Sequence, residues 1–170
     1  MKDKKRLFLI DAYALIFRGY YAFIKNPRIN SKGLDTSAIL GFTNSLFDVI
    51  KREKPDYLAV CFDKGGSKDR IKIFEEYKAN RDETPEGIKI AVPIIEDILN
   101  SLNISILVKE GYEADDIIGT IAQKAKTQNF ETYMVTPDKD FAQLVEEDVY
   151  MYRPVFYKCL PLQKHQKQTM

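Results

Sequence analysis

The chain contains 170 residues, of which 45% are apolar and 30% are charged, and its formal net charge is +1. This length suits a single domain with a substantial core, and the nearly balanced charge does not by itself indicate a nucleic-acid partner. No apolar stretch is long enough to span a bilayer and no signal-peptide core follows the basic N-terminus, so we expect a cytoplasmic protein without a membrane partner.

The few cysteine and histidine residues restrict the chemistry that is open to the chain. Cys61 lies in an apolar stretch and Cys159 in a polar one, which suggests neither a disulfide framework nor a thiolate metal site. The single histidine, His165, is far along the chain from the acidic motifs. A Ser-His-Asp triad, a Cys-His pair and a multi-histidine zinc site are therefore disfavoured. Any hydrolysis must rely on carboxylates, lysine and metal-activated water.

Strand-like and helix-like segments alternate along the chain. We expect strands at residues 6–11, 57–63, 104–108, 131–135 and 149–152, and helices at 12–23, 37–53, 86–102, 114–126 and 139–144. Thr36 or Ser37 is expected to cap the second helix, Pro93 to delay or kink the third, and Gly119 to allow close packing of the fourth. The alternation predicts an α/β fold with a mainly parallel sheet, helices on both faces and right-handed crossovers.

Two segments depart from this alternation. Residues 64–86 are dense in charge, and Ile71, Phe74 and Tyr77 recur at a spacing of three, which predicts a helical segment that stands off the core or is mobile. The stretch from Lys64 to Ser67 lacks the spaced glycines and terminal Lys-Ser/Thr of a phosphate-binding loop. Residues 153–170 contain no acid and no apolar period. We therefore expect one domain over residues 1–152, followed by an irregular tail at 153–170.

Carboxylates follow four of the expected strands. The acids are Asp11, Asp63, Glu113, Asp115, Asp116, Asp138 and Asp140. Because the carboxyl ends of parallel strands share one edge of a sheet, we expect these side chains to gather at one rim. Clustered carboxylates repel one another and need cations to stay together, and all-oxygen ligands suit Mg²⁺ or Mn²⁺.

A simpler explanation accounts for some of these acids. The chain has 25 acidic residues, and acids are favoured in the first turn of any helix, where they meet the positive end of the dipole. That preference alone explains Asp115 and Asp116. It does not explain why Asp11 and Asp63 each end an apolar strand, so the metal-binding interpretation is the stronger one.

Six motifs, in order, resemble the 5′-nuclease (5′-3′ exonuclease) domain of bacterial DNA polymerase I, within the flap-endonuclease family. They occupy residues 9–11, 17–23, 60–63, 77–81, 111–119 and 136–140. The resemblance implies a PIN-like α/β fold and divalent-metal-dependent cleavage of DNA near a free 5′ end or flap, as in DNA repair and replication. It also implies that the seven acids bind or orient Mg²⁺ or Mn²⁺, and that residues 64–86 form a helical arch.

The resemblance also suggests which residues act on DNA. It implies a catalytic set of Lys78, Arg81, Asp63 and Asp116, in which Lys78 and Arg81 contact the scissile phosphate. The expected DNA-binding set is Arg18, Lys68, Arg70, Lys72, Tyr77, Lys78 and Arg81. From pattern alone, Lys78 and Arg81 form a solvated charged face. Tyr77 equally suits base stacking or a core position in line with Phe74, and Arg18 suits a phosphate contact or an ion pair with a rim acid.

The sequence also departs from that family. Family members continue with a further Asp pair and a helix-hairpin-helix element, and this sequence shows neither, nor a polymerase domain. We therefore expect a truncated, monomeric chain with weakened activity. The alternatives are a catalytically crippled DNA-binding fragment and a small PIN-type ribonuclease. A haloacid-dehalogenase-type phosphatase is set aside, because it needs an Asp where this chain has Tyr13.

Overall fold

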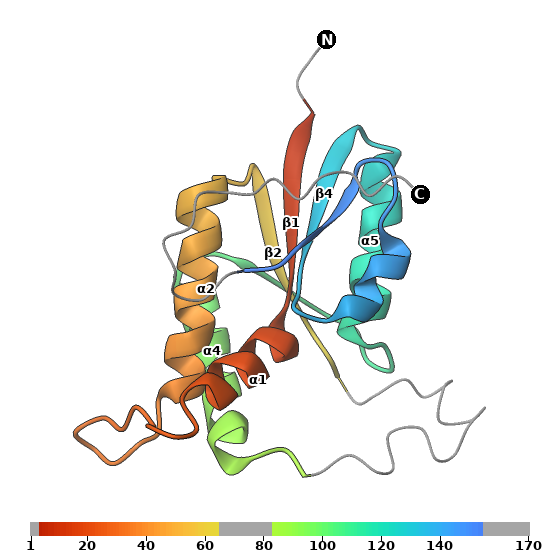
Figure 1. The fold of residues 1–170 in the computed structure, drawn as a ribbon. Coiled ribbons are helices and arrows are strands. Elements are labelled where there is room, and N and C mark those ends of the chain that lie inside the picture. The colour runs from red at the N-terminus through yellow and green to blue at the C-terminus, as the bar shows by residue number, and fades with distance from the viewer. Residues whose placement is uncertain (1–3, 65–82, 155–170) are drawn as a thin grey trace.

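The computed structural model describes residues 4–64 and 83–154, and its core is a five-stranded parallel sheet (Figure 1). The strands are β1 (Lys5–Asp11), β2 (Tyr57–Phe62), β3 (Ser105–Val108), β4 (Phe130–Val135) and β5 (Val149–Tyr152). The helices are α1 (Ala12–Ala22), α2 (Ser37–Glu53), α4 (Glu86–Ser101) and α5 (Ala114–Lys126), with a 3₁₀ helix, η1, at Lys139–Leu144. The expected α/β fold is confirmed.

The strand order is β3-β2-β1-β4-β5, and every neighbouring pair is parallel. Residue Leu9 of β1 pairs with Ala59 of β2 on one side and with Met134 of β4 on the other. The central strand β1 therefore holds both halves of the sheet in register. Because all strands point the same way, their carboxyl ends meet at one edge.

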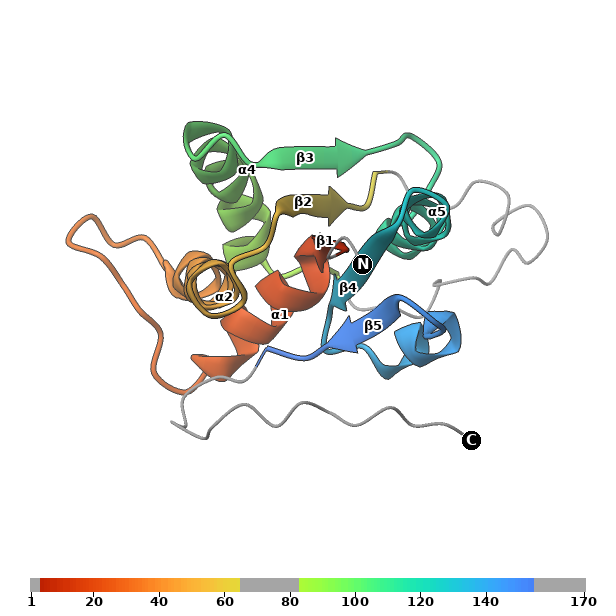
Figure 2. The ribbon, with the colours of Figure 1, turned by 90° about the horizontal axis from the view of Figure 1, so that it is seen from above.

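Helices cover both faces of the sheet, as Figure 2 shows from above, with α1, α2 and α4 on one face and α5 on the other. Alternation along the strands produces this division, since successive side chains point to opposite faces. Phe8 and Ile10 of β1 pack into the core under α1, α2 and α4, whereas Leu9 packs into the core under α5. All three side chains are fully buried. In the described ranges, 4–64 and 83–154, no helix is long and apolar enough to cross a membrane.

Helices α1 and α2 cross at two glycines. A Cβ added at Gly41 would lie 2.4 Å from the Cα of Gly19. No side chain fits in that space, so the pair allows the two backbones to touch. The close approach expected at Gly119 is wrong, because a Cβ there would meet the methyl groups of Leu144 at ordinary contact distances of 3.5 and 3.7 Å.

The start of α2 differs from the expected cap. Thr36 occupies the N-cap position but makes no side-chain cap hydrogen bond, and its hydroxyl donates to the carbonyl oxygen of Arg28 at 2.7 Å. Ser37 Oγ accepts from the backbone N–H of Arg28 at 2.8 Å. Asp35 Oδ1 instead accepts from the N–H of Ser37. The two hydroxyls therefore anchor the preceding loop, and a carboxylate meets the first free amide of the helix.

Pro93 does not delay α4, which begins at Glu86 and continues through the proline. A proline removes one backbone hydrogen bond from a helix interior. Buried side chains on both sides of it, Ile88 and Ala91 before and Ile95 and Leu99 after, hold the helix against the core. Packing therefore offsets the missing bond.

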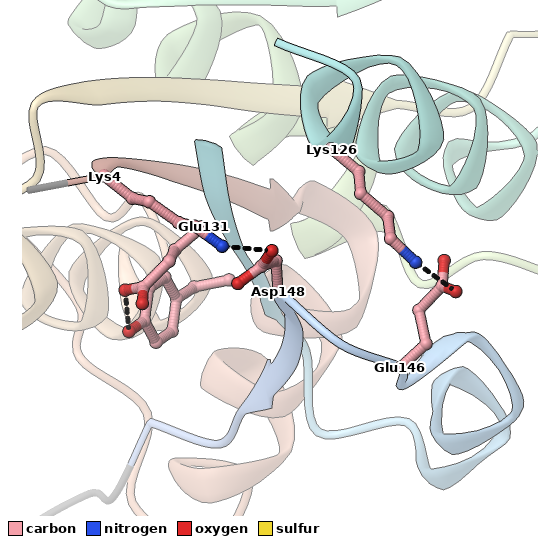
Figure 3. A network of polar contacts seen from close by, with 6 residues as sticks. Lys4, Lys126, Glu131, Glu146 and Asp148 are labelled. Atoms are coloured by element: carbon pink, nitrogen blue, oxygen red, sulfur yellow. Dashed lines mark hydrogen bonds and ion pairs between the residues drawn. The ribbon is translucent and has the colours of Figure 1, made fainter. Parts of the chain in front are cut away.

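Ion pairs fix the turn that precedes β5 to the rest of the fold (Figure 3). Lys4 Nζ lies 2.5 Å from Asp148 Oδ2, beside the start of β1, and Lys126 Nζ at the end of α5 lies 2.8 Å from Glu146 Oε2. Glu146 also accepts from the side-chain amide of Gln123. Such solvent-accessible pairs add little stability one by one, but together they position the edge strand.

Candidate metal centre

The seven predicted acids all follow strand ends at the carboxyl edge of the sheet. Asp11 is the last residue of β1, and Asp63 comes directly after β2. Glu113 is the N-cap of α5, with Asp115 and Asp116 in its first turn. Asp138 is the N-cap of η1, with Asp140 in its first turn. The predicted gathering of these segments at one edge follows from the parallel sheet.

Asp11 is buried, with 8% of its surface exposed. Its Oδ1 caps α1 by accepting from the N–H of Ala14 at 3.1 Å, and its Oδ2 accepts from the Thr136 hydroxyl at 3.1 Å. Burial raises the pKa of Asp11 to about 6, and the carboxylates of Asp63 and Asp138 add to the increase. A negative charge at this position is therefore unfavourable without a compensating cation.

Asp63 connects β2 to the start of α5. Its Oδ1 accepts from the N–H of Ala114 at 2.6 Å. Glu113 is buried, with 5% of its surface exposed, and forms a capping box with Asp116, whose Oδ2 accepts from the N–H of Glu113 at 3.1 Å. Asp115 Oδ1 accepts from the N–H of Asp116. These acids therefore stabilise the start of α5 by accepting hydrogen bonds from its free amides, whether or not they also bind metal.

Thr136 is a site residue to which the sequence analysis gave no role. Its side chain is fully buried, and its hydroxyl both donates to Asp11 and accepts from the N–H of Asp138 at 3.1 Å. Asp138 Oδ1 in turn accepts from the N–H of Asp140 at 2.9 Å. The sequence does contain a signal for this role, which is a threonine after a strand and two residues before an Asp. Hydroxyls at such positions bind nearby backbone amides.

The oxygen donors of this site suit a hard cation, but the described side chains do not converge on one ion. Within residues 4–64 and 83–154, no three Asp, Glu, His or Cys side chains lie close enough together to hold one ion. Like charges repel, and several of the carboxylates are turned toward backbone amides instead. The donors are nonetheless all oxygens, as hard cations prefer. Burial first, and the carboxylates of Asp63 and Asp138 second, raise the pKa of Asp11, so a nearby cation would stabilise its charged form.

The predicted DNA-binding residues are mostly beyond what the structure describes. Arg18 lies on α1 and is partly buried, which lowers the pKa of its guanidinium. The other predicted contacts with DNA fall outside the described residues; they are Lys68, Arg70, Lys72, Tyr77, Lys78 and Arg81. The expected helical arch over residues 64–86 falls largely within the same segment. These assignments stay predictions.

Comparisons with known proteins agree with the fold and the motifs. Residues 6–169 match the model of the family described as the 5′-3′ exonuclease, N-terminal resolvase-like domain. A 5′-3′ exonuclease of Aquifex aeolicus is 39% identical over 151 residues, which cover 89% of this chain and 52% of that protein. A DNA polymerase I of Treponema pallidum is 39% identical over 153 residues, 90% of this chain and 15% of the polymerase.

Among solved structures, the zinc-bound 5′-exonuclease of phage T5 has a similar fold. It superposes with a TM-score of 0.66 at 20% identity, covering 88% of this chain and 55% of that one. The chain thus spans about half the length of the Aquifex exonuclease and of the T5 structure. By the match over most of its sequence and by its sheet, the chain belongs to the family of the N-terminal, resolvase-like domain of 5′-3′ exonucleases.

Proposed function

We propose that the chain is a divalent-metal-dependent 5′ nuclease that hydrolyses phosphodiesters of DNA near a free 5′ end or flap. The observation that carries the proposal is the contact between Asp11 and Thr136. It joins two acidic segments from neighbouring strand ends around a carboxylate whose pKa is raised. Strongly shifted carboxyl pKa values are common at functional sites. The family match gives the reaction class.

The residues proposed to hold Mg²⁺ or Mn²⁺ are Asp11, Asp63, Glu113, Asp115, Asp116, Asp138 and Asp140. Bound divalent ions supply charge neutralisation at phosphorus and a water of lowered pKa. The protein's own part is positioning. Ala14 N–H and Thr136 orient the Asp11 carboxylate, and Ala114 N–H orients that of Asp63. Both carboxylates are therefore held in place before a substrate arrives, which removes part of the ordering cost.

Lys78 and Arg81 are proposed to contact the scissile phosphate, with Arg18, Lys68, Arg70, Lys72 and Tyr77 as further DNA contacts. Their charges would offset the repulsion between the acidic rim and the phosphates. A role in repair and replication is proposed from the exonuclease and polymerase relatives. A monomeric state and a boundary at residue 152 also stay predictions, and the family match continues to residue 169.

A second candidate is a DNA-binding chain that cleaves weakly by itself. The observation in its favour is that, among the described side chains, no three acids converge on one point. The small ribonuclease alternative gains no support from the relatives, which are exonucleases and DNA polymerases. The two remaining candidates differ in one measurable property, which is turnover in the presence of metal.

The deciding experiment compares 5′-flap DNA, linear duplex and covalently closed circular duplex in Mg²⁺, Mn²⁺ or EDTA. We expect metal-dependent cleavage of the first two and an intact circle. Asp11→Asn should abolish cleavage, whereas Asp97→Asn should not, because Asp97 is an exposed carboxylate near the C-terminal end of α4. Binding of the flap without cleavage in either metal would favour the second candidate. Equal cutting of the closed circle would contradict a need for a free end.

A further inference from the structure

A small hollow lies between the end of β3 and the first turns of α5. Its volume is about 220 Å³, and its walls come from Leu107 and Val108, from the loop residues Lys109 and Tyr112, and from α5. The α5 residues in the wall are Asp116, Ile117, Thr120 and Ile121. The strand β3 is an edge strand of the sheet, so one of its edges pairs with no other described strand. Val108 is 47% exposed and Tyr112 is 43% exposed.

The size of the hollow limits what it can take. Sites for drug-sized molecules usually measure about 300–1,000 Å³, and stable protein interfaces bury at least ~1,000 Å². A volume of about 220 Å³ is below the range for drug-sized molecules and is too local for a stable protein interface, so it suits one flat ring system. Four of the eight lining residues are aliphatic, and the others are one tyrosine, one threonine, one lysine and one aspartate. This mixture favours a ligand that combines an apolar face with a charged group.

The wall of the hollow also carries a cation next to an aromatic ring. Lys109 Nζ lies over one face of the Tyr112 ring, 4.6 Å from its centroid, so a base would stack on the other face. An aromatic ring stacks on any nucleobase, and a lysine beside it binds the phosphate of the same or the next nucleotide. The neighbouring acid in the wall, Asp116, repels a phosphate but not a neutral base. The charges therefore place the base inside and the phosphate at Lys109.

The hollow adjoins the carboxylate rim, because Asp116 belongs to both. Resting on the proposed function, we propose that the hollow binds one unpaired nucleotide of the DNA strand that occupies the metal centre, with its base stacked on Tyr112 and its phosphate at Lys109. A strand whose phosphate lies at the rim thereby gains a second point of attachment. That attachment fixes the position of the strand along its own length and so selects which phosphodiester is cut.

The test measures binding without turnover. A fluorescent thymidine 12-mer and an abasic 12-mer with the same phosphates are titrated in EDTA at low salt. The wild-type chain should prefer the base-bearing strand by about 5- to 100-fold, the range expected for one stacked base. Tyr112→Ala should lose this preference and Tyr112→Phe should keep it. Lys109→Ala should weaken both strands and reduce the slope of log Kd against log salt by about one.

Tyr57→Ala is the matched control, since Tyr57 is similarly exposed, at 47%, but begins β2, at the amino ends of the strands. It should leave the preference unchanged. If Tyr112→Ala fails to fold, as judged by circular dichroism, ring resonances of Tyr112 in the wild-type chain replace it. They should shift with the thymidine strand and not with the abasic strand. A preference that survives in Tyr112→Ala, or unshifted resonances, overturns the inference.

Two further outcomes separate this inference from the proposed function. If the wild-type chain shows a Tyr112-dependent base preference but no metal-dependent cleavage, the proposed nuclease is rejected and the nucleotide site is kept. If it cleaves without that preference, the nucleotide site is rejected and the nuclease is kept. Thymidine monophosphate is the third ligand, and binding as tight as that of the 12-mer would overturn the proposal of a strand site in favour of a free nucleotide site.

Discussion

The hydroxyl of Thr136 donates to Asp11 Oδ2 at 3.1 Å, across 125 residues of sequence. Asp11 ends β1 and Thr136 directly follows the neighbouring strand β4, so the bond fixes the relative position of two acidic segments. The same hydroxyl accepts from the N–H of Asp138. One buried side chain therefore controls both the carboxylate with the raised pKa and the start of η1.

Thr136→Val tests this role, because valine has a similar shape but no hydroxyl. We expect the free energy of unfolding to fall by about 1–3 kcal/mol, since the buried Asp11 carboxylate and the Asp138 N–H both lose a partner. Cleavage should fall as well, because Asp11 is no longer oriented. Urea unfolding and flap cleavage measure the two effects. Thr136→Ser keeps the hydroxyl and is the control; a threonine that acts only by packing would make serine as damaging as valine.

The pKa of Asp11 predicts how stability depends on pH in EDTA. Its folded value of about 6 lies above the ordinary 3.8, so the folded state holds the proton more tightly than the unfolded state does. This contribution is fully present below about pH 4 and is lost as the pH rises through 6. Above that pH, the ionised carboxylate makes the folded state less stable than it is at low pH, by about 3 kcal/mol.

Asp11→Asn should therefore stabilise the metal-free chain at pH 7.5 by about 1–3 kcal/mol and change little at pH 4. Asparagine caps a helix about as well as aspartate, so the bond with Ala14 N–H is kept. Urea unfolding at both pH values gives the comparison. A variant that is less stable than the wild-type chain at pH 7.5 would show that the charge at this position favours folding.

Divalent ions should raise the melting temperature of the wild-type chain. A ligand that binds only the folded state stabilises it by about 2.7 kcal/mol at a concentration of 100 Kd. Differential scanning fluorimetry in Mg²⁺, Mn²⁺ or EDTA measures the shift, with KCl at matched ionic strength as the control. Asp63→Asn should reduce the shift. The proposed metal centre would be rejected by melting temperatures that respond to ionic strength alone.

Gly41→Ala should destabilise the fold by about 1–3 kcal/mol, although alanine is the better helix former. The new methyl group would lie 2.4 Å from Gly19 Cα and would force α1 away from α2. Gly119→Ala is the matched control in another helix, where the added methyl makes only ordinary contacts with Leu144. It should stabilise by about 0.5–1 kcal/mol. Thermal unfolding of both variants decides whether backbone contact, rather than helix propensity, determines the result.

The elements of the described residues were predictable from sequence to within one residue at each end. Apolar runs that end in Asp11 and Asp63 gave the strands, and helical spacing gave the amphipathic helices. The details that failed depend on contacts between distant segments. The capping role of Asp35, the glycine crossing at Gly19 and the bond from Thr136 each need a partner that local pattern does not specify.

In the candidate site, too, the local pattern was predictable and the contacts between distant segments were not. The acids were found because each follows a strand, and parallel strands share one edge. Their orientation was not predictable, because Asp63 is turned toward the N–H of Ala114 in a helix 51 residues further along the chain. The hollow beside Tyr112 was also missed, since it forms only when α5 packs beside the end of β3.

The position of β1 in the sheet has a consequence for biosynthesis. Of the two partners of β1, strand β2 ends at Phe62, whereas β4 ends only at Val135. One edge of the strand therefore lies open on the nascent chain until most of the domain has been synthesised, and an open apolar edge invites pairing with other chains. Docking of β4 closes that edge and brings Thr136 to Asp11 in the same event. The contact that orients Asp11 in the proposed metal centre therefore forms only when this edge of β1 is covered.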